Sequence, residues 1–444
     1  MGEEVNIKVF NLNCYGLKFV SKFRKERFKA IAEFLSTTGS EYDLVFLQEV
    51  WTRGDYDTLK ASLCPTEDAP DPYPYTHFFN NGIIGSGTCI FSKHRLLRAN
   101  YHAFSMNGSP TFIWHGDWFA SKGMGVCQIR IELPSNNQTN DQVIQKPDFF
   151  DVHLYISHYH ANYDGTDSDR YLGHRVLHAF ESAQWLNLTS SSADMVIYAG
   201  DFNTEPDSLP YQMLSKFPQL KDAWKVWNGH NTTNKGCTSE TPNNSFTPAP
   251  KQKSCCRKDP EAVVEDEGKR IDYIMYGDGP RSKVNLTKCS FPLPDRVPGK
   301  DFSFSDHEAI DAEFILKRIT QETGGDVAEE KKECLEVVDK AINVMDKTLK
   351  ANVRRGTGKY AIYSLLCFAG FVFSFAPDAY EDLTSLQRIY LDICLFIPRM
   401  LLVFGVAIFF LMGTLFVKRE KHALTETKSQ LNLIKVNDAK TLFD

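Results

Sequence analysis

The sequence predicts an α/β domain with layered sheets over residues 1–319, followed by a helical stalk and two membrane-spanning helices. Two observations carry this prediction. Up to about Ile319, short apolar runs alternate with polar loops and helical patterns, as in domains that layer helices on sheets. After about Thr320 the composition changes to a polar linker, an amphipathic pattern and two long apolar stretches.

Six short apolar runs are predicted to be strands because each has the length and the apolar content of a buried strand. They are residues 42–50, 87–92, 125–131, 149–158, 194–202 and 270–276. Two segments, 25–38 and 175–188, are predicted to be helices, since apolar side chains recur on one face of each. Residues 228–268, rich in Gly, Pro, Ser and Lys, are too long for a simple connection and are predicted to be an insertion or a flexible loop.

Residues 320–359 are predicted to form a linker and an amphipathic helix. Apolar residues recur there at spacings of three and four, which is a heptad-like seam. The seam is Leu335, Val338, Ile342, Met345 and Leu349. Two interpretations stay open: a stalk that lies on its own domain or on a membrane, and a short coiled coil that makes a homodimer. The membrane helices are a second place where a homodimer could form.

Residues 360–377 and 400–417 carry no charge and have about the length that a helix needs to cross the hydrocarbon core. Residues 378–399 are then a short non-cytosolic loop, and residues 418–444 a cytosolic tail. Basic residues flank the two spans, and such flanks stay in the cytosol. They are Lys350, Arg354, Arg355 and Lys359 before the first span, and Lys418, Arg419 and Lys421 after the second.

The chain is therefore predicted to be a multi-pass membrane protein with its N-terminal domain and both termini in the cytosol. The modest spans favour the endoplasmic reticulum or another endomembrane. The first residues, "MGEEVNIKVF", do not have the pattern of a signal peptide. The sequons at Asn137, Asn187, Asn231 and Asn285 would then remain unmodified.

The net charge of −6 has the wrong sign for a general nucleic-acid binder, so no nucleic-acid partner is expected. The 11 cysteines show no C-x-x-C zinc pair, and thiols without a signal peptide favour a reducing compartment.

Several predicted strands end in acids, amides or imidazoles. The apolar run "LVFLQ" ends at Glu49, and a carboxylate there suits a hard cation such as Mg²⁺. "KVFNLN" ends with Asn11 and Asn13, whose neutral amides could orient water or hold a phosphate. In "GDFN", Asp201 and Asn203 point to the same side of a strand. Such an acid and amide could hold a phosphoryl group.

In "SHYH", His158 and His160 are also predicted to share a face, and the absence of a third ligand at zinc spacing favours a phosphate-stabilising role. Asp272 lies in a strand and is the expected partner of His307, because a carboxylate that accepts one imidazole N–H leaves the other nitrogen free as a base. Together these motifs predict a magnesium-assisted phosphodiester hydrolase in which His307 deprotonates an attacking water.

The motifs "NLNCYG", "LQEVW", "SHYHA", "GDFN", "RIDYI" and "SDHEAI", in this order, resemble those of the endonuclease/exonuclease/phosphatase superfamily over about residues 5–318. "GIIGSGTCIFSKH", "HGDWF" and the two C-terminal spans are similar to the short, two-span membrane type of neutral sphingomyelinase. The resemblance implies a four-layer α/β sandwich, with two packed mixed sheets flanked by helices. It also implies hydrolysis of the membrane lipid sphingomyelin to ceramide and phosphocholine, with Mg²⁺ as the cofactor and Mn²⁺ as an alternative ion.

The resemblance implies a role for each motif residue. His307 would be the general base and Asp272 its orienting partner. Asp201 would either protonate the leaving alkoxide or organise the metal site. The residues implied on the metal side are Glu49, Asn13 and Asp306. Those implied to contact or stabilise the phosphate are Asn13, Asn203, His158 and Lys122.

Other functions stay open on the same catalytic frame: hydrolysis of lyso-choline phospholipids, a phosphoinositide phosphatase or a nuclease. A non-catalytic membrane scaffold would be expected to lack one of Glu49, Asp201, Asn203 or His307, and all are present. The aromatic stretch 101–119 has two interpretations, ordinary core packing or insertion into a bilayer interface. The residues concerned are Phe104, Met106, Phe112, Trp114 and Trp118.

Overall fold

The computed structural model describes residues 4–64, 72–109, 116–133, 149–163, 169–229, 234–247, 268–319, 327–375 and 383–437. Contacts divide the chain into two compact units, one that reaches to Val337 and one that begins at Val338. The first contains two six-stranded sheets, and the second is helical.

The first sheet has the strand order β11-β12-β1-β2-β4-β3. Its strands are β1 (Glu4–Asn13), β2 (Leu44–Gln48), β3 (Tyr75–Phe78), β4 (Cys89–Ser92), β11 (Ser282–Ser290) and β12 (Ile310–Arg318). β1 runs parallel to β2 and antiparallel to β12, so the sheet is mixed. The pairing of Asn13 with Gln48 brings the ends of β1 and β2 together at one edge.

The second sheet has the order β5-β6-β7-β8-β10-β9. Its strands are β5 (Leu96–Ala103), β6 (Gly123–Glu132), β7 (Phe149–His158), β8 (Met195–Asp201), β9 (Lys221–Asp222) and β10 (Asp272–Asp278). β7 is parallel to β8 with His158 opposite Asp201, and β10 is antiparallel to β8 with Asp272 opposite Asp201. Three polar side chains therefore meet where these strands begin or end.

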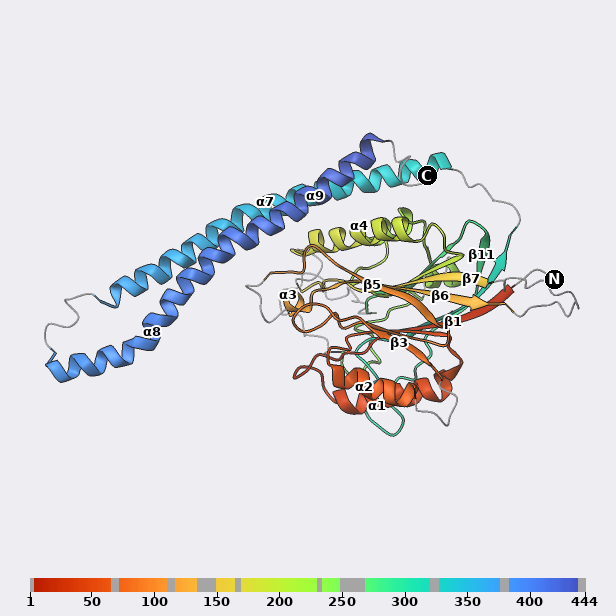
Figure 1. Ribbon diagram of the computed structural model, residues 1–444, viewed down its shortest axis with the longest axis horizontal. Coiled ribbons are helices and arrows are strands. Elements are labelled where there is room, and N and C mark those ends of the chain that lie inside the picture. Colours follow the sequence, from red (N-terminus) through yellow and green to blue (C-terminus); the bar gives the residue numbers. More distant parts are fainter. Residues whose placement is uncertain are drawn as a thin grey trace, which may run out of the picture. The chain divides into compact units, whose positions relative to one another are not determined.

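Helices cover the outer faces of both sheets (Figure 1). α1 (Arg24–Ser36) and α2 (Arg53–Leu63) lie on the β1 sheet, and α4 (Leu172–Thr189) lies on the other. The shorter elements are η1 (Thr38–Glu41), α3 (Asp117–Ala120), α5 (Leu209–Lys216) and α6 (Ala223–Asn228). The prediction of two packed mixed sheets flanked by helices is confirmed.

The core between the sheets follows from strand alternation, because every second residue faces inward. Ile7 and Val9 of β1 pack there with Val152, Leu154 and further apolar residues of β7 and β8. The intervening residues of β1 and β2 face α1 and α2, where Phe10 and Leu47 contact Phe28 and Leu59 within a second buried cluster. The central strands β2, β7 and β8 are thus buried on both faces, which fixes the positions of their polar ends.

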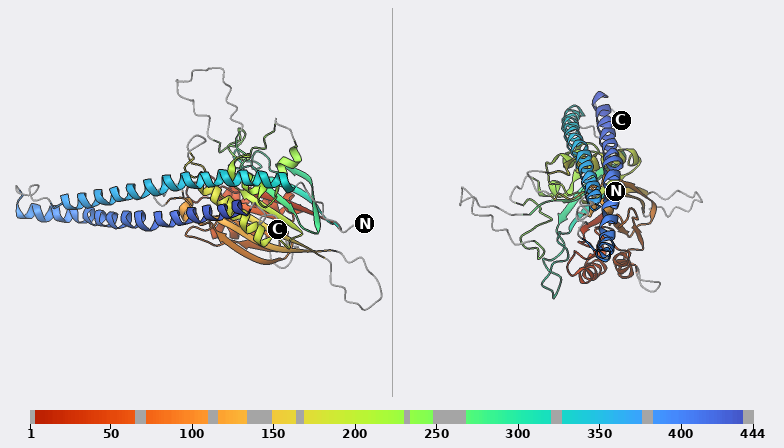
Figure 2. Two further views of the ribbon diagram at one scale, coloured as in Figure 1. Left: turned by 90° about the horizontal axis from the view of Figure 1, so that it is seen from above. Right: turned by 90° about the vertical axis from the view of Figure 1, so that its left-hand side faces the viewer.

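The helical unit is an antiparallel hairpin (Figures 1 and 2). α7 (Val327–Phe373) runs beside α8 (Ser385–Leu411), a π-helical turn (Met412–Phe416) and α9 (Val417–Val436). Asp339 pairs with Lys435 at 2.6 Å, Asp346 with Lys428 at 2.7 Å, and the Ser364 hydroxyl donates to the Val406 carbonyl at 3.2 Å. Two helices of the described chain are long and apolar enough to cross a membrane.

Two features differ from the sequence-based predictions. Phe104 and Met106 are 1% and 3% exposed, so insertion into a bilayer was wrong for them. Phe104 instead stacks on His178 in the core, 4.2 Å between ring centroids. Phe112 and Trp114 lie outside the described residues. The helix α8 begins at Ser385, within the segment predicted to be a loop.

Candidate active site

The edge of the two sheets where β1, β2, β7 and β8 end gathers most of the predicted site residues. Parallel strands place their carboxyl ends at one edge, and β10 starts there because it runs antiparallel to β8. Ser305 carries the 302–310 segment to the same edge, since its hydroxyl donates to the Asn13 carbonyl at 2.6 Å.

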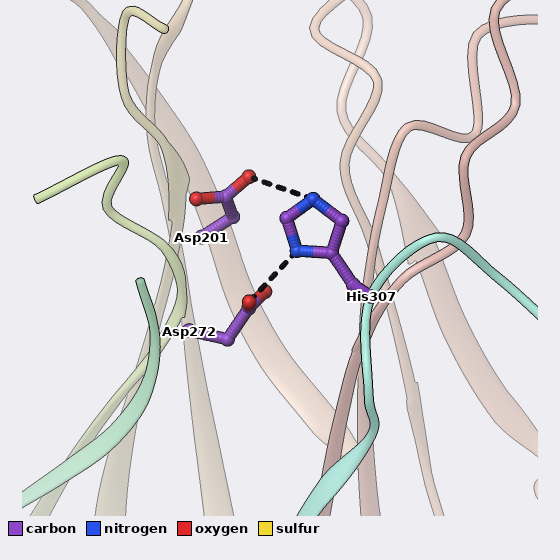
Figure 3. A group of neighbouring side chains, drawn as sticks. All are labelled: Asp201, Asp272 and His307. Atoms are coloured by element: carbon purple, nitrogen blue, oxygen red, sulfur yellow. Dashed lines mark hydrogen bonds and ion pairs between the residues drawn. The ribbon is translucent and has the colours of Figure 1, made fainter. Parts of the chain in front are cut away.

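His307 and Asp272 form a close pair (Figure 3). Nδ1 of His307 lies 2.8 Å from Oδ2 of Asp272, and Nε2 faces Oδ2 of Asp201 at 4.0 Å. Burial alone would lower the pKa of His307, but the nearby carboxylates, Asp272 first among them, outweigh it and hold the pKa well above its ordinary value. A carboxylate on Nδ1 fixes the tautomer that leaves Nε2 available to accept a proton.

Thr238 holds Asp272 in place, and sequence reasoning missed it. Its hydroxyl donates to Oδ2 of Asp272 at 2.6 Å and accepts the backbone N–H groups of Ile271 and Asp272 at 3.2 and 3.1 Å. Its neighbour Ser239 forms β-bridges with Lys269 and His307. The described part of the predicted insertion, residues 234–247, therefore lines the site. Its polar composition, which suggested only a loop, was the available signal.

Asn13 connects the two sheets at the site. Its amide Nδ2 donates to Oε1 of Glu49 at 3.1 Å and to Oδ2 of Asp201 at 3.0 Å. Glu49 has φ of 58°, a conformation that a non-glycine residue rarely adopts and that is often kept at functional sites. Gly16 passes so close to Glu49 that an added Cβ would lie 1.9 Å from its carbonyl oxygen.

Carboxyl groups are concentrated at this edge. Burial and the nearby Asp272 carboxylate raise the pKa of Asp201 to about 7. Burial raises the pKa of Asp306 to about 6, and the charge of Glu49 adds to the shift although His307 opposes it. Buried carboxylates that raise one another's pKa indicate a site that a positive charge would stabilise. Carboxylate oxygens are ligands that Mg²⁺ prefers, so this group of carboxylates fits a hard divalent cation.

His158 is buried and faces Asp201 with 3.5 Å between Nε2 and Oδ2. Burial, with the charge of Lys122, lowers its pKa well below the ordinary value, so the ring is neutral at neutral pH. A neutral imidazole can still donate one N–H to a phosphoryl oxygen. Asn203, with φ of 46°, donates its backbone N–H to Asp201 and its side-chain amide to the Tyr159 carbonyl.

Lys122 is buried beneath the site. Its ammonium lies 2.7 Å from Oδ1 of Asp117 and donates to the Tyr159 carbonyl at 2.7 Å. That carbonyl also accepts the amide of Asn203, so Lys122 acts on the site through Tyr159 and Asn203. Asp117 was another residue that sequence reasoning missed. It lies in the "HGDWF" motif, whose resemblance to the family carried no role for the acid.

Asn11 and His160 do not join the site. Asn11 accepts a hydrogen bond from the Gln48 amide at 2.8 Å, and both side chains are buried between strands. His160 packs on Tyr171, with ring centroids 3.9 Å apart, on the side of Asp117. The alternation that placed His158 and His160 on one face ends with β7 at His158.

A site of acids, amides and a histidine at the strand ends of two packed sheets is typical of one family of proteins, and the sequence comparison identifies that family. The Endonuclease/Exonuclease/phosphatase family matches residues 10–307, and the chain belongs to that family.

Among its relatives, sphingomyelin phosphodiesterase 2 of Homo sapiens is 32% identical over 314 residues, which are 70% of this chain and 65% of that protein. Inositol phosphosphingolipids phospholipase C of Schizosaccharomyces pombe is 29% identical over 326 residues, 70% of this chain and 69% of that protein. The chain spans about 65% of the length of the first curated relatives it matches. A beta toxin structure from Staphylococcus aureus is 18% identical, covers 69% of this chain and 99% of its own, and superposes with a TM-score of 0.46.

Proposed function

We propose that this chain is a membrane-bound phosphodiesterase that hydrolyses sphingomyelin to ceramide and phosphocholine. The observation that carries the proposal is the His307–Asp272 pair with Nε2 directed at a group of carboxylates and amides. The names of the relatives, sphingomyelin phosphodiesterase 2 and inositol phosphosphingolipids phospholipase C, support a sphingolipid phosphodiester as substrate.

In the proposed reaction, Nε2 of His307 accepts a proton from water, and the water oxygen attacks phosphorus in line. The bond between phosphorus and the ceramide oxygen breaks, and that oxygen takes up a proton to become the ceramide hydroxyl. Asp272 holds the ring of His307 and balances the charge that it gains. His158 and Asn203 donate hydrogen bonds to the phosphoryl oxygens. Asp201 organises the site, since Asn13 and Asn203 donate to its two oxygens.

The proposed metal ligands are Glu49 and Asp306, with Asn13 beside them. Their oxygens and the surplus of negative charge fit Mg²⁺, and Mn²⁺ as an alternative. When bound, a divalent ion would stabilise the charge that develops on the phosphoryl oxygens. In its absence the carboxylates of this edge repel one another, which is the physical reason to expect a requirement for the ion.

Lipid headgroups other than phosphocholine define a second candidate. The relative from S. pombe is named for inositol phosphosphingolipids, so a phosphoinositol headgroup on the same lipid class is the specific alternative. Lyso-choline phospholipids, which share the choline headgroup, remain the other substrate class to separate by experiment.

The test is headgroup release by the full chain from detergent mixed micelles of sphingomyelin, inositol phosphoceramide or a lyso-choline phospholipid, with Mg²⁺ or with a chelator. We expect sphingomyelin to be hydrolysed fastest and the chelator to stop turnover. His307→Ala should lower the rate at least ~10³-fold, because general base catalysis typically contributes 10²–10⁴-fold. Normal turnover by that variant would falsify the mechanism. Faster release from inositol phosphoceramide would identify that lipid, and not sphingomyelin, as the preferred substrate.

We also propose that the N-terminal domain and both described ends of the helical hairpin face the cytosol, in the endoplasmic reticulum or another endomembrane. The basic residues that flank the two apolar stretches support this orientation.

A further inference from the structure

Two loops of the N-terminal domain expose pairs of large apolar side chains. In the loop after β1, Phe19 is 94% and Val20 is 62% exposed. In the loop between β3 and β4, Ile83 is 75% and Ile84 is 37% exposed. Single exposed apolar residues are ordinary on soluble surfaces, but adjacent pairs at loop tips are not explained by core packing. We call these the Phe19 tip (Phe19 and Val20) and the Ile83 tip (Ile83 and Ile84).

Both tips belong to loops that contact the segment just after Glu49. The loop of the Phe19 tip passes this segment at Gly16, which lies against the Glu49 carbonyl. The loop of the Ile83 tip reaches it at Gly87, whose carbonyl accepts the Val50 N–H at 2.9 Å. The tips therefore lie at the edge of the sheet where the candidate active site opens.

The base of each loop is fixed, and the tip is left exposed. Arg27 is buried and donates to the carbonyls of Lys22 and Cys14, and Phe23 stacks on Phe302 at 4.4 Å. The backbone N–H groups of Val20 and Ser21 donate to the Leu17 carbonyl, which closes a tight turn around Phe19.

The second loop is held in the same way. Both Ile83 and Ile84 donate their backbone N–H groups to the Phe119 carbonyl at 3.3 Å. Gly82, Gly85 and Gly87 have positive φ, so the backbone turns sharply on either side of the pair.

The charged residues around the Phe19 tip indicate the kind of surface that the tip contacts. Residues 17–25 read "LKFVSKFRK" and contain no acid, and Lys18, Lys22 and Lys25 are exposed. Among the described residues, Arg24 is the cation of this run that forms an ion pair, with Asp55. Apolar side chains flanked by lysines are the composition of segments that insert at the surface of an anionic bilayer.

We propose that the Phe19 and Ile83 tips insert into the headgroup boundary of the membrane that carries the substrate, with the lysines on anionic lipids. The inference rests on the proposed function, because a lipid substrate must leave the bilayer at the opening of the site. The occupant is a lipid surface, and a protein partner on the same tips is an outcome that the experiment can detect.

The first experiment compares two substrates for the full chain in proteoliposomes that contain phosphatidylserine. The variants are Phe19→Gly with Val20→Gln, and Ile83→Gln with Ile84→Gln. Glycine is used at position 19 because φ is 73° there. The control is Leu188→Gln, since Leu188 is 78% exposed at the end of α4, away from the end of β8 that carries Asp201.

We expect each tip variant to hydrolyse sphingomyelin in the bilayer about 10-fold more slowly. Activity on a water-soluble choline phosphodiester should stay within about twofold, and Leu188→Gln should be unchanged on both. Equal loss on both substrates would overturn the proposal, since the tips would then support the site itself. No loss on either substrate would overturn it as well.

The second experiment does not depend on turnover. A photoreactive benzoylphenylalanine is placed at position 19, 83 or 188 of the full chain in the same vesicles. Positions 19 and 83 should crosslink to lipid, more with phosphatidylserine than without, and position 188 should not. If positions 19 and 83 crosslink to lipid in a preparation that does not hydrolyse sphingomyelin, the proposed function fails and the membrane contact of the tips stands. Crosslinks from 19 and 83 to protein only would overturn it.

Discussion

One carboxylate oxygen, Oδ2 of Asp272, accepts hydrogen bonds from both Thr238 and His307. The buried Thr238 hydroxyl therefore shares with His307 the carboxylate oxygen whose negative charge favours the imidazolium. Because a base is active only after it loses its proton, the raised pKa of His307 places the acid limb of the rate profile above the ordinary histidine range. From this arrangement we expect opposite shifts of the acid limb when Asp272 and when Thr238 is replaced.

Replacing Asp272 with Asn should move the acid limb of the kcat/KM profile to lower pH, because the charge that favours the imidazolium is removed. The rate above the limb should fall roughly 10²-fold, since the amide no longer balances the charge that His307 gains. The profile is measured on micellar sphingomyelin at saturating Mg²⁺. An unmoved limb, with the rate lowered, would mean that His307 is not the group that titrates.

Replacing Thr238 with Val should move the same limb to higher pH, because Oδ2 of Asp272 loses the competing Thr238 donor and its charge then acts on His307 alone. The rate should fall about 10-fold, as for other partners that orient a catalytic ligand. Thr238→Ser is the matched control, since it retains the hydroxyl. A Val variant that loses rate without any shift of the limb would have only a structural defect.

Sequence reasoning placed together the residues that end strands, because strand alternation and parallel pairing fix where such residues lie. Asn13, Glu49, Asp201 and His307 meet at one edge for this reason. It could not find Thr238, since nothing in a polar loop specifies that the loop folds back onto β10. It gave Lys122 direct contact with phosphate, while the structure pairs its ammonium with Asp117 and the Tyr159 carbonyl.

Among the strands and helices, the edge strands are the elements that the sequence pattern predicts least well. β5 and β11 lie at the ends of their sheets and were not predicted. β5 has no buried residue, and most of β11 is exposed or half-buried. Their sequences, "LLRANYHA" and "SKVNLTKCS", lack the apolar run that marked the central strands. Only one side of an edge strand pairs, and its polar residues discourage pairing with other chains. Buried strands such as β7 and β8 were found because both of their faces are apolar.

The heptad-like seam of α7 has a partner in its own chain. Of the seam residues, Val338 and Met345 are buried, whereas Leu335, Ile342 and Leu349 are half-buried. Leu424, Leu431 and Ile434 of α9 are buried too. Between them run the ion pairs Asp339–Lys435 and Asp346–Lys428. An intramolecular hairpin therefore pairs the seam that had suggested a homodimer with α9 of the same chain.

Zero-length carbodiimide coupling can test this pairing in the unsubstituted chain, with one substituted variant as a control. An equal mixture of ¹⁴N- and ¹⁵N-labelled full chains is crosslinked in detergent and analysed by mass spectrometry. Asp339 should couple to Lys435, and Asp346 to Lys428, with both peptides carrying the same label. Pairs of mixed label at these positions would show that the seam joins two chains. Asp339→Asn is the control for non-specific coupling. It should remove the crosslink to Lys435 and leave the crosslink between Asp346 and Lys428 unchanged.

The chain joins a candidate lipid-phosphodiesterase domain to two apolar helices. The charges that flank these helices favour an orientation in which the N-terminal domain faces the cytosolic side of the membrane. Basic residues precede residue 360 and follow residue 417, while the connecting segment carries few. Asn285 belongs to a sequon and is exposed on β11, so it would be modified if the domain faced the lumen. In cell-derived microsomes we expect the protein to have the same gel mobility with and without endoglycosidase.

Limited trypsin digestion of the same sealed microsomes tests the helical hairpin separately. Lys418, Arg419, Lys428 and Lys435 should be cut from outside, since they follow the second span, whereas Arg388 and Arg399 should be cut only after detergent opens the vesicles. The detergent-treated sample is the control that every site can be cleaved. Cleavage at Arg388 in sealed vesicles, with residues 418–435 protected, would reverse the orientation and place the His307 site on the lumenal side.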